Sequence, residues 1–158
     1  MIYIAHRGNT QGPNPEYENN PDYIDEALER RFVRSINDAE IDLRCKDGDL
    51  YLGHDTPQYK INVQWLVERS YSLWVHCKDP QAFDVALELN LNCFWHNSDD
   101  YTLTKYGYVW AYPGLMPIGY KTIMVLPSNI DLVDMNSFDK AFGICSDNVD
   151  FYRANERK

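Results

Sequence analysis

Eight short, apolar, β-prone segments recur along the chain, and their character constrains the fold more than any other feature. Most are apolar throughout instead of alternating between apolar and polar residues, which is typical of parallel strands whose two faces are both covered. Gly, Pro, Asn and Asp stand at their flanks, as expected for strands that end in turns. The segments lie at residues 2–6, 39–44, 50–54, 73–78, 92–96, 108–112, 122–126 and 142–146.

Helical segments are predicted between several of these strands, and each begins at a residue that favours a helix start. Asp79 followed by Pro80 is typical, because Asp caps free N–H groups and Pro suits the first helical position. The predicted helices cover residues 23–32, 63–70 and 81–89, and residues 101–106 are expected to add one or two turns.

Alternation of strands and helices indicates an α/β fold, and we predict a compact (β/α)8 TIM-type barrel with reduced helices in its second half. Such barrels usually need ~250 residues, whereas the 158 residues of this chain leave roughly 20 for each unit. An open, doubly wound sheet is therefore the alternative. The length predicts a single domain over residues 1–158.

Composition narrows the range of partners. The formal net charge is −9, which disfavours binding to nucleic acid or to anionic membranes, although local cations can still hold a small phosphate ligand. No apolar run is long enough for stable membrane anchoring, and no signal peptide follows Met1. The cysteines show no C-x-x-C spacing, which favours unpaired thiols in a cytoplasmic protein. The oligomeric state does not follow from the sequence.

All four histidines lie at or near the carboxyl end of a predicted strand. They are His6, His54, His76 and His96. Ligands and catalytic groups gather at that edge of parallel α/β folds, because the following loops converge there. One such histidine alone would more simply cap its strand, but four at one edge favour a site.

Glu40 and Asp42 are two residues apart in a predicted strand, so their side chains project from the same face. Two neighbouring buried carboxylates repel one another unless a cation or a proton lies between them. Oxygen ligands of this kind suit Mg²⁺ or Ca²⁺. The alternative is an exposed edge strand whose acidic residues are solvated. Arg7 and Lys78 lie near the same edge and offer positive charge.

Several short motifs occur in an order that resembles the glycerophosphodiester phosphodiesterase family. This family belongs to the phosphatidylinositol phospholipase C-like phosphodiesterase superfamily, which also includes spider-venom phospholipase D toxins, and its pattern reads H-R-G, P-E-N-T, E-x-D-V, D-G and H-D. The resemblance covers residues 2–55. The matching residues here are His6-Arg7-Gly8, Glu18-Asn19, Glu40-x-Asp42, Asp47-Gly48 and His54-Asp55.

The resemblance implies a TIM barrel that cleaves a small phosphodiester with a divalent cation, Mg²⁺ or Ca²⁺, with Mn²⁺ as a further choice. Such cleavage needs a base for the attacking oxygen, an acid for the leaving alkoxide and positive charge around the phosphate. By position, the resemblance implies His6 and His54 as general acid and base, Glu40 and Asp42 as metal ligands, and Arg7 and Lys78 as phosphate contacts.

The sequence departs from the family pattern at two places. The third metal-binding carboxylate, expected two residues before the lysine, is replaced by His76, which we therefore expect as a third ligand although imidazole suits Mg²⁺ and Ca²⁺ less well. The loop reads NPEYENNP instead of P-E-N-T, so that Glu16 remains an alternative to Glu18.

The chain beyond Lys78 offers weaker indications of a substrate-facing wall, because Trp and Tyr fill protein cores more often than they bind ligands. We assign to this wall Trp95, His96 and Trp110, with Tyr112 and Asp147 beside them, and we add Glu18 from the N-terminal part of the chain. The alternatives to a phosphodiesterase are a non-catalytic relative that binds a phosphorylated small molecule, a phosphomonoesterase or other metal-assisted hydrolase, and a domain without a site.

Overall fold

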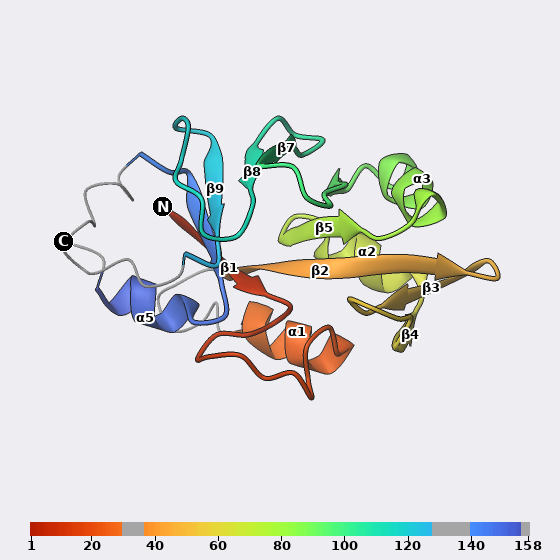
Figure 1. Cartoon of the computed structure of the whole chain (residues 1–158). Coiled ribbons are helices and arrows are strands. Elements are labelled where there is room, and N and C mark those ends of the chain that lie inside the picture. Colours follow the sequence, from red (N-terminus) through yellow and green to blue (C-terminus); the bar gives the residue numbers. More distant parts are fainter. Residues whose placement is uncertain (30–36, 128–139, 156–158) are drawn as a thin grey trace.

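The computed structural model describes residues 1–29, 37–127 and 140–155 (Figure 1). Its helices are α1 (Pro21–Glu29), α2 (Val63–Arg69), α3 (Pro80–Glu88) and α5 (Val149–Ala154). Its strands are β1 (Ile2–His6), β2 (Asn37–Lys46), β3 (Asp49–Leu52), β4 (Tyr59–Ile61), β5 (Leu73–Cys77), β6 (Asn92–Phe94), β7 (Tyr101–Leu103), β8 (Val109–Ala111), β9 (Thr122–Val125) and β10 (Gly143–Ser146).

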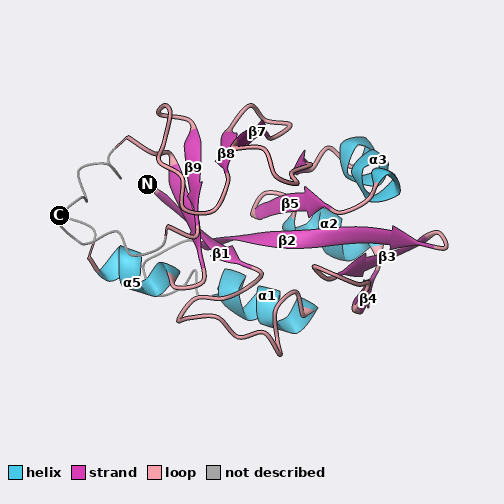
Figure 2. Cartoon of the chain, viewed as in Figure 1, coloured by secondary structure: helices cyan, strands magenta, loops and turns pink. Residues whose placement is uncertain are grey.

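All ten of these strands belong to one mixed sheet, which curls into a half-barrel (Figure 2). Its central strands run parallel in the order β6-β5-β2-β1-β10-β9-β8. The antiparallel pairs are β2 with β3, β3 with β4, and β7 with β8. The parallel pairing expected from the apolar segments therefore occurs along the centre of the sheet.

The predicted (β/α)8 TIM-type barrel is wrong. Each predicted strand segment overlaps an observed strand, but the segment at 50–54 forms β3, which turns back antiparallel along β2 instead of starting a new parallel unit. The turns expected at 101–106 are also not helical, because residues 101–103 form β7 and pair with β8. One predicted parallel strand forms a hairpin instead, and loops replace several of the helices. The sheet therefore forms a half-barrel.

The three predicted helices are present as α1, α2 and α3. Asn62 accepts a hydrogen bond from the backbone N–H of Trp65 at the start of α2, and Asp79 does the same for Ala82 in α3. These caps satisfy N–H groups that the first helical turn leaves free. The end of the first predicted helix, at residues 30–32, lies outside the described residues. Helix α5 was not predicted.

The strands place apolar side chains on both faces of the sheet. Ile41 and Leu43 of β2 belong to the outer layer, which α1 and α3 cover. On the inner face, Ile4, Trp74 and Phe94 pack with further apolar residues. Because side chains alternate along a strand, the residues that continue the inner face toward the strand ends include the polar groups of the candidate site.

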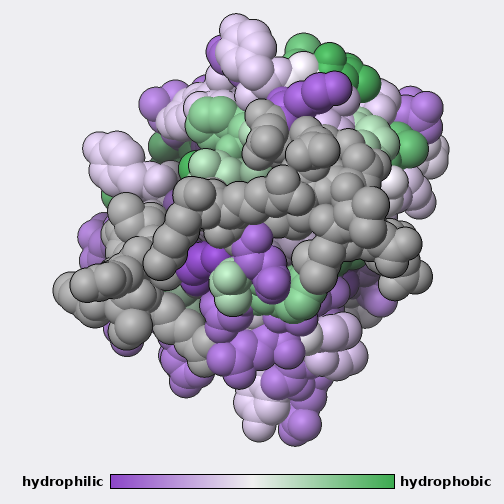
Figure 3. Space-filling model, turned by 90° about the vertical axis from the view of Figure 1, so that its left-hand side faces the viewer, coloured by the Kyte–Doolittle hydropathy of each residue, from purple (hydrophilic) through white to green (hydrophobic). Residues whose placement is uncertain are grey.

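The surface is in keeping with the formal net charge of −9. On the side shown in Figure 3, hydrophilic residues cover much of the lower part, and hydrophobic residues appear in smaller areas.

The four cysteines are free, and Cys77, Cys93 and Cys145 are buried, as expected for structural thiols. Among the described residues, no helix is both long enough and apolar enough to cross a membrane.

Candidate active site at the strand ends

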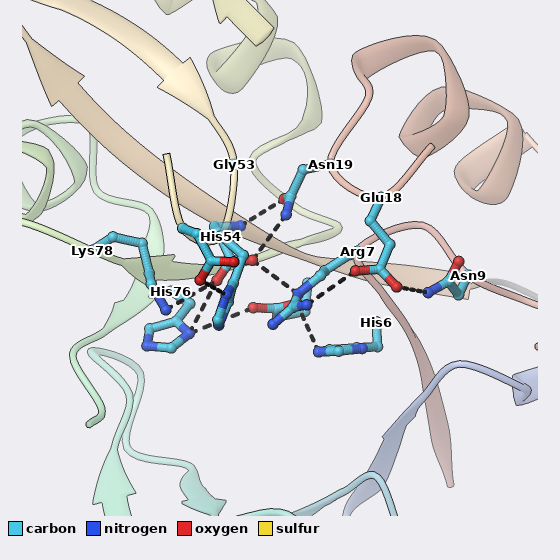
Figure 4. A network of polar contacts seen from close by, with 12 residues as sticks. His6, Arg7, Asn9, Glu18, Asn19, Gly53, His54, His76 and Lys78 are labelled. Atoms are coloured by element: carbon cyan, nitrogen blue, oxygen red, sulfur yellow. Dashed lines mark hydrogen bonds and ion pairs between the residues drawn. The ribbon is translucent and has the colours of Figure 1, made fainter. Parts of the chain in front are cut away.

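The parallel register of β1, β2 and β5 brings four polar side chains into one row. His6 is paired with Glu40 in the register of β1 and β2, and Asp42 with His76 in that of β2 and β5. All four side chains lie on the inner face, near the carboxyl ends of β1 and β5. In Figure 4, His6, Arg7, His76 and Lys78 converge from different parts of the chain.

His54 reaches this row through the hairpin of β2 and β3. Strand β2 continues past the site, and β3 returns, so that the backbone N–H of Gly53 donates to the carbonyl of Asp42 at 3.0 Å. Gly53 has a φ of 149°, and a Cβ there would lie 2.1 Å from the backbone oxygen of Thr56. The Arg44 guanidinium donates to the carbonyls of Gly53 and His54. The turn before His54 therefore requires glycine at position 53, and the hydrogen bonds from Arg44 hold its backbone in place.

Arg7 follows β1 in a left-handed backbone conformation, with a φ of 51°. This conformation costs roughly 1–2 kcal/mol for a residue other than glycine. Its guanidinium is held between two carboxylates, with Nη1 3.0 Å from Glu18 Oε2 and Nε 3.0 Å from Asp42 Oδ2. Gly8 comes next, also at positive φ, and a Cβ there would lie 2.9 Å from Tyr23 Cδ1. The H-R-G turn thus directs Arg7 into the site.

Asp42 is fully buried and is held by Asn19. The Asn19 side chain donates to Oδ2 at 2.8 Å and accepts from the backbone N–H of Asp42 at 2.9 Å. The other oxygen, Oδ1, lies 3.3 Å from His76 Nδ1 and 3.5 Å from Lys78 Nζ. Burial alone would raise the pKa of Asp42, but His76, Arg7 and Lys78 outweigh it and hold this pKa well below its usual range.

Glu40 is the less compensated carboxylate. It is 2% exposed, and its Oε2 accepts no hydrogen bond from any residue that the structure describes. Its nearest basic neighbours are His6 Nε2, 4.0 Å from Oε2, and His76 Nδ1, 3.8 Å from Oε1. Burial and the negative charge of Asp42 raise its pKa. A buried carboxylate in this position favours a cation beside it.

His6 is oriented by Asp147, which follows β10. His6 Nδ1 lies 2.7 Å from Asp147 Oδ1, and Asn9 Nδ2 donates to the same oxygen at 2.8 Å. Burial lowers the pKa of His6, but the hydrogen bond to Asp147 and the charge of Glu40 raise it by more, so that the pKa lies above its ordinary value. The same hydrogen bond helps to lower the pKa of Asp147.

His54 lies in a different environment. Its side chain is 42% exposed, and its Nδ1 lies 2.7 Å from Asp55 Oδ1. Burial and the nearby charges of Arg7 and Lys78 lower the pKa of His54 below its ordinary value, against the opposing effect of Asp42. The two histidines of the motif therefore differ in exposure and have pKa values shifted in opposite directions.

The residues assigned to a substrate wall lie in several places. Glu18 joins the network through Arg7 and Asn9. Trp110 is buried and stacks on Phe94, with ring centroids 4.4 Å apart. Trp95 is partly exposed and packs beside Phe83 of α3.

His96 is buried, with Nε2 hydrogen-bonded to the carbonyl of Asp99 and its ring edge-on to Tyr112. Its own carbonyl accepts from His76. Within the part of the chain that the structure describes, Trp95 and Trp110 make no polar contact with the network, whereas His96 contributes its backbone carbonyl.

Sequence reasoning missed the role of Asn9 and assigned Asp147 a different role. Asn9 is fully buried and joins Glu18 to Asp147, and so ties the first loop to the last strand end. The available signal was a polar residue directly after the H-R-G turn. Asp147 follows a predicted strand, which places it at a strand end but does not by itself identify His6 as its partner.

Glu40, Asp42 and His76 form a group whose ligand atoms all lie within 4.8 Å of one another. Because Glu40 Oε2 and Asp42 Oδ1 are buried and accept no hydrogen bond within the described ranges, this donor set fits a divalent cation. Comparisons of the chain with family models, with curated proteins and with solved structures found no match.

Proposed function

We propose that this protein is a divalent-cation-dependent phosphodiester hydrolase, similar in its site to the glycerophosphodiester phosphodiesterases. The observation that carries the proposal is the arrangement at the strand ends. His6 and His54 come from separate elements and flank a buried Glu40–Asp42 pair, with Arg7 and Lys78 beside it. Acid, base, cation ligands and phosphate-binding cations thus occur together.

The phosphate would lie where positive charge is available. Lys78 Nζ lies 3.5 Å from Asp42, and Arg7 approaches the same carboxylate from its other oxygen. Preorganised cations of this kind stabilise the charge that develops on the non-bridging oxygens in the transition state. A divalent cation on Glu40, Asp42 and His76, Mg²⁺, Ca²⁺ or Mn²⁺, would add Lewis-acid charge and lower the pKa of a bound oxygen nucleophile.

His6 and His54 divide the proton transfers between them. One imidazole takes the proton of the attacking hydroxyl as its oxygen bonds to phosphorus, and the other gives a proton to the alkoxide that leaves. The raised pKa of His6 and the lowered pKa of His54 favour His6 as the acid and His54 as the base. Water as nucleophile gives a phosphomonoester and an alcohol, whereas a substrate hydroxyl gives a cyclic phosphate.

The test is hydrolysis of bis-p-nitrophenyl phosphate and of a glycerophosphodiester in Mg²⁺, Mn²⁺ or Ca²⁺. His6→Ala and His54→Ala should each lower kcat by at least ~100-fold, the contribution expected of general acid–base catalysis. Glu68→Gln, at an exposed carboxylate of α2, serves as the control and should keep full activity. Thermal melts verify that each variant is folded. Activity that survives both histidine substitutions would refute the mechanism.

A phosphate-binding protein without turnover is the second candidate, because Asp42 is already neutralised by Arg7 and by Lys78. For such a protein, a broad panel of diesters should show no hydrolysis, while a phosphodiester still raises the melting temperature. The same panel distinguishes a phosphomonoesterase, which would release phosphate from p-nitrophenyl phosphate instead.

A further inference from the structure

We infer that the cation site selects Mn²⁺, Fe²⁺, Co²⁺ or Zn²⁺ over Mg²⁺ and Ca²⁺, with Nδ1 of His76 as a ligand beside Glu40 and Asp42. This inference rests on the proposed function only for the presence of a cation at the site. Cation binding can be measured without turnover, so the two can fail separately.

The hydrogen bond at the far side of the His76 ring fixes which nitrogen faces the carboxylates. His76 Nε2 lies 2.9 Å from the backbone carbonyl of His96. A carbonyl oxygen only accepts hydrogen bonds, so Nε2 carries the hydrogen. In the neutral ring the lone pair is then on Nδ1. A metal-binding histidine typically donates its other N–H to a carbonyl or carboxylate in this way.

The ring plane of His76 is also fixed. It stacks on Phe94, with centroids 4.9 Å apart and an interplanar angle of 15°. Phe94 in turn stacks on Trp110, which is buried in the inner apolar layer. Together with the hydrogen bond to the carbonyl of His96, this stack holds Nδ1 toward the two carboxylates.

Each carboxylate presents one oxygen to this nitrogen. Asp42 Oδ1 lies 3.3 Å from His76 Nδ1, while Oδ2 is occupied by Asn19 and Arg7. Glu40 Oε1 lies 3.8 Å from the same nitrogen. Two carboxylate oxygens and an imidazole lone pair directed at one small volume repel each other unless a metal ion, or a proton on Nδ1, lies between them. An imidazole nitrogen among the ligands favours ions such as Fe²⁺ and Zn²⁺, whereas a set of oxygen ligands alone favours Mg²⁺ and Ca²⁺.

Charge also disfavours the hard cations. Mg²⁺ and Ca²⁺ are bound by oxygen and depend on the number of carboxylates around them. This site offers two, and the positive charges of Arg7 and Lys78 lie against one of them. For transition-metal ions, whose affinity for nitrogen follows the Irving–Williams order, the imidazole ligand compensates for the small number of carboxylates. It does not do so for Mg²⁺ or Ca²⁺.

The experiment is calorimetric titration of the EDTA-treated full chain with each metal ion alone. We expect Co²⁺ and Zn²⁺ to bind at least ~10-fold more tightly than Mg²⁺ or Ca²⁺, with Mn²⁺ in between because it is the weakest binder of the transition-metal series. His76→Asp should narrow or reverse this preference, because it restores an oxygen ligand. Pulsed EPR of Mn²⁺ bound to the unmodified protein should show coupling to a histidine nitrogen. This last readout does not depend on a variant that folds.

His54→Asn is the matched control, because His54 lies outside the cluster and pairs with Asp55. The His54→Asn variant should keep the preference for transition-metal ions while it loses the hydrolysis of diesters. Selective binding without hydrolysis in the unmodified protein would sink the proposed function but leave this inference standing. Tighter binding of Mg²⁺ or Ca²⁺, or Mn²⁺ without nitrogen coupling, would overturn the inference whether or not diesters are hydrolysed.

Discussion

Replacement of Asp147 tests whether His6 acts through a fixed orientation. Asp147 Oδ1 is 2.7 Å from His6 Nδ1, and this contact turns Nε2 toward Glu40. A hydrogen bond to a charged group contributes about 1.5–3 kcal/mol, and a neutral one about 0.5–1.5 kcal/mol. Asp147→Asn keeps an acceptor but loses the charge, at a cost of about 1–1.5 kcal/mol. Asp147→Ala loses the whole bond.

These energies convert to rates if the orientation of His6 matters in the transition state. At about 1.4 kcal/mol for each factor of ten, kcat should fall ~5- to 10-fold in Asp147→Asn and ~10- to 100-fold in Asp147→Ala. The pKa of His6 is raised by this hydrogen bond, so its loss lowers that pKa. The limb of the kcat–pH profile that reports His6 therefore moves to lower pH, whether His6 is the acid or the base.

The assay is the pH dependence of kcat for bis-p-nitrophenyl phosphate at a saturating metal concentration. Asp150→Asn is the control, since Asp150 lies on α5 and pairs with Gln11 and Arg153 away from His6. Equal profiles for Asp147→Asn and Asp150→Asn would refute the reasoning. A lower kcat without a shifted limb would show that Asp147 acts on folding or packing instead of on His6.

Three further predictions follow from burial and backbone geometry. Burial raises the pKa of Glu40, so the folded protein loses stability as the pH rises from the unfolded-state pKa toward the folded-state pKa of this group. Glu40→Gln should therefore raise the melting temperature in EDTA at neutral pH. A lower melting temperature would contradict this. Lys78→Met should lower kcat by ~10²–10³-fold, as loss of one preorganised donor does, while Lys60→Met, at an exposed pair, should not. Gly53→Ala should destabilise the chain in urea by more than Gly48→Ala, which shares a positive φ but would meet no atom within 4 Å; equal losses would argue against the clash.

Much of the local structure could be predicted because its causes are local. The apolar segments became strands, and residues such as Asp79 begin helices where capping favours them. The hairpin after β2 could not be predicted from periodicity. Residues 50–54 are as apolar as a parallel strand, and their direction depends on the Asp47–Gly48 turn, where both residues adopt positive φ. That turn converts a predicted parallel unit into an antiparallel pair.

The candidate site was easier to predict than the fold around it. Glu40, Asp42 and His76 share a face because of strand periodicity, and the parallel register aligns them with His6. His54 was expected at a parallel strand end, but it reaches the site from the returning strand of a hairpin. Contacts between segments that are distant in the sequence were harder to predict. The link of Asn9 to Asp147 spans 138 positions, and only the closed packing of β1 beside β10 reveals it.

The most direct test of the account is diffraction from crystals soaked with Mn²⁺ and a slowly hydrolysed phosphorothioate diester. We predict an anomalous peak among Glu40, Asp42 and His76, with the phosphorus between His6 and His54. A phosphodiester bound elsewhere on the molecule, or a cation absent from these three side chains at saturating Mn²⁺, would contradict the account.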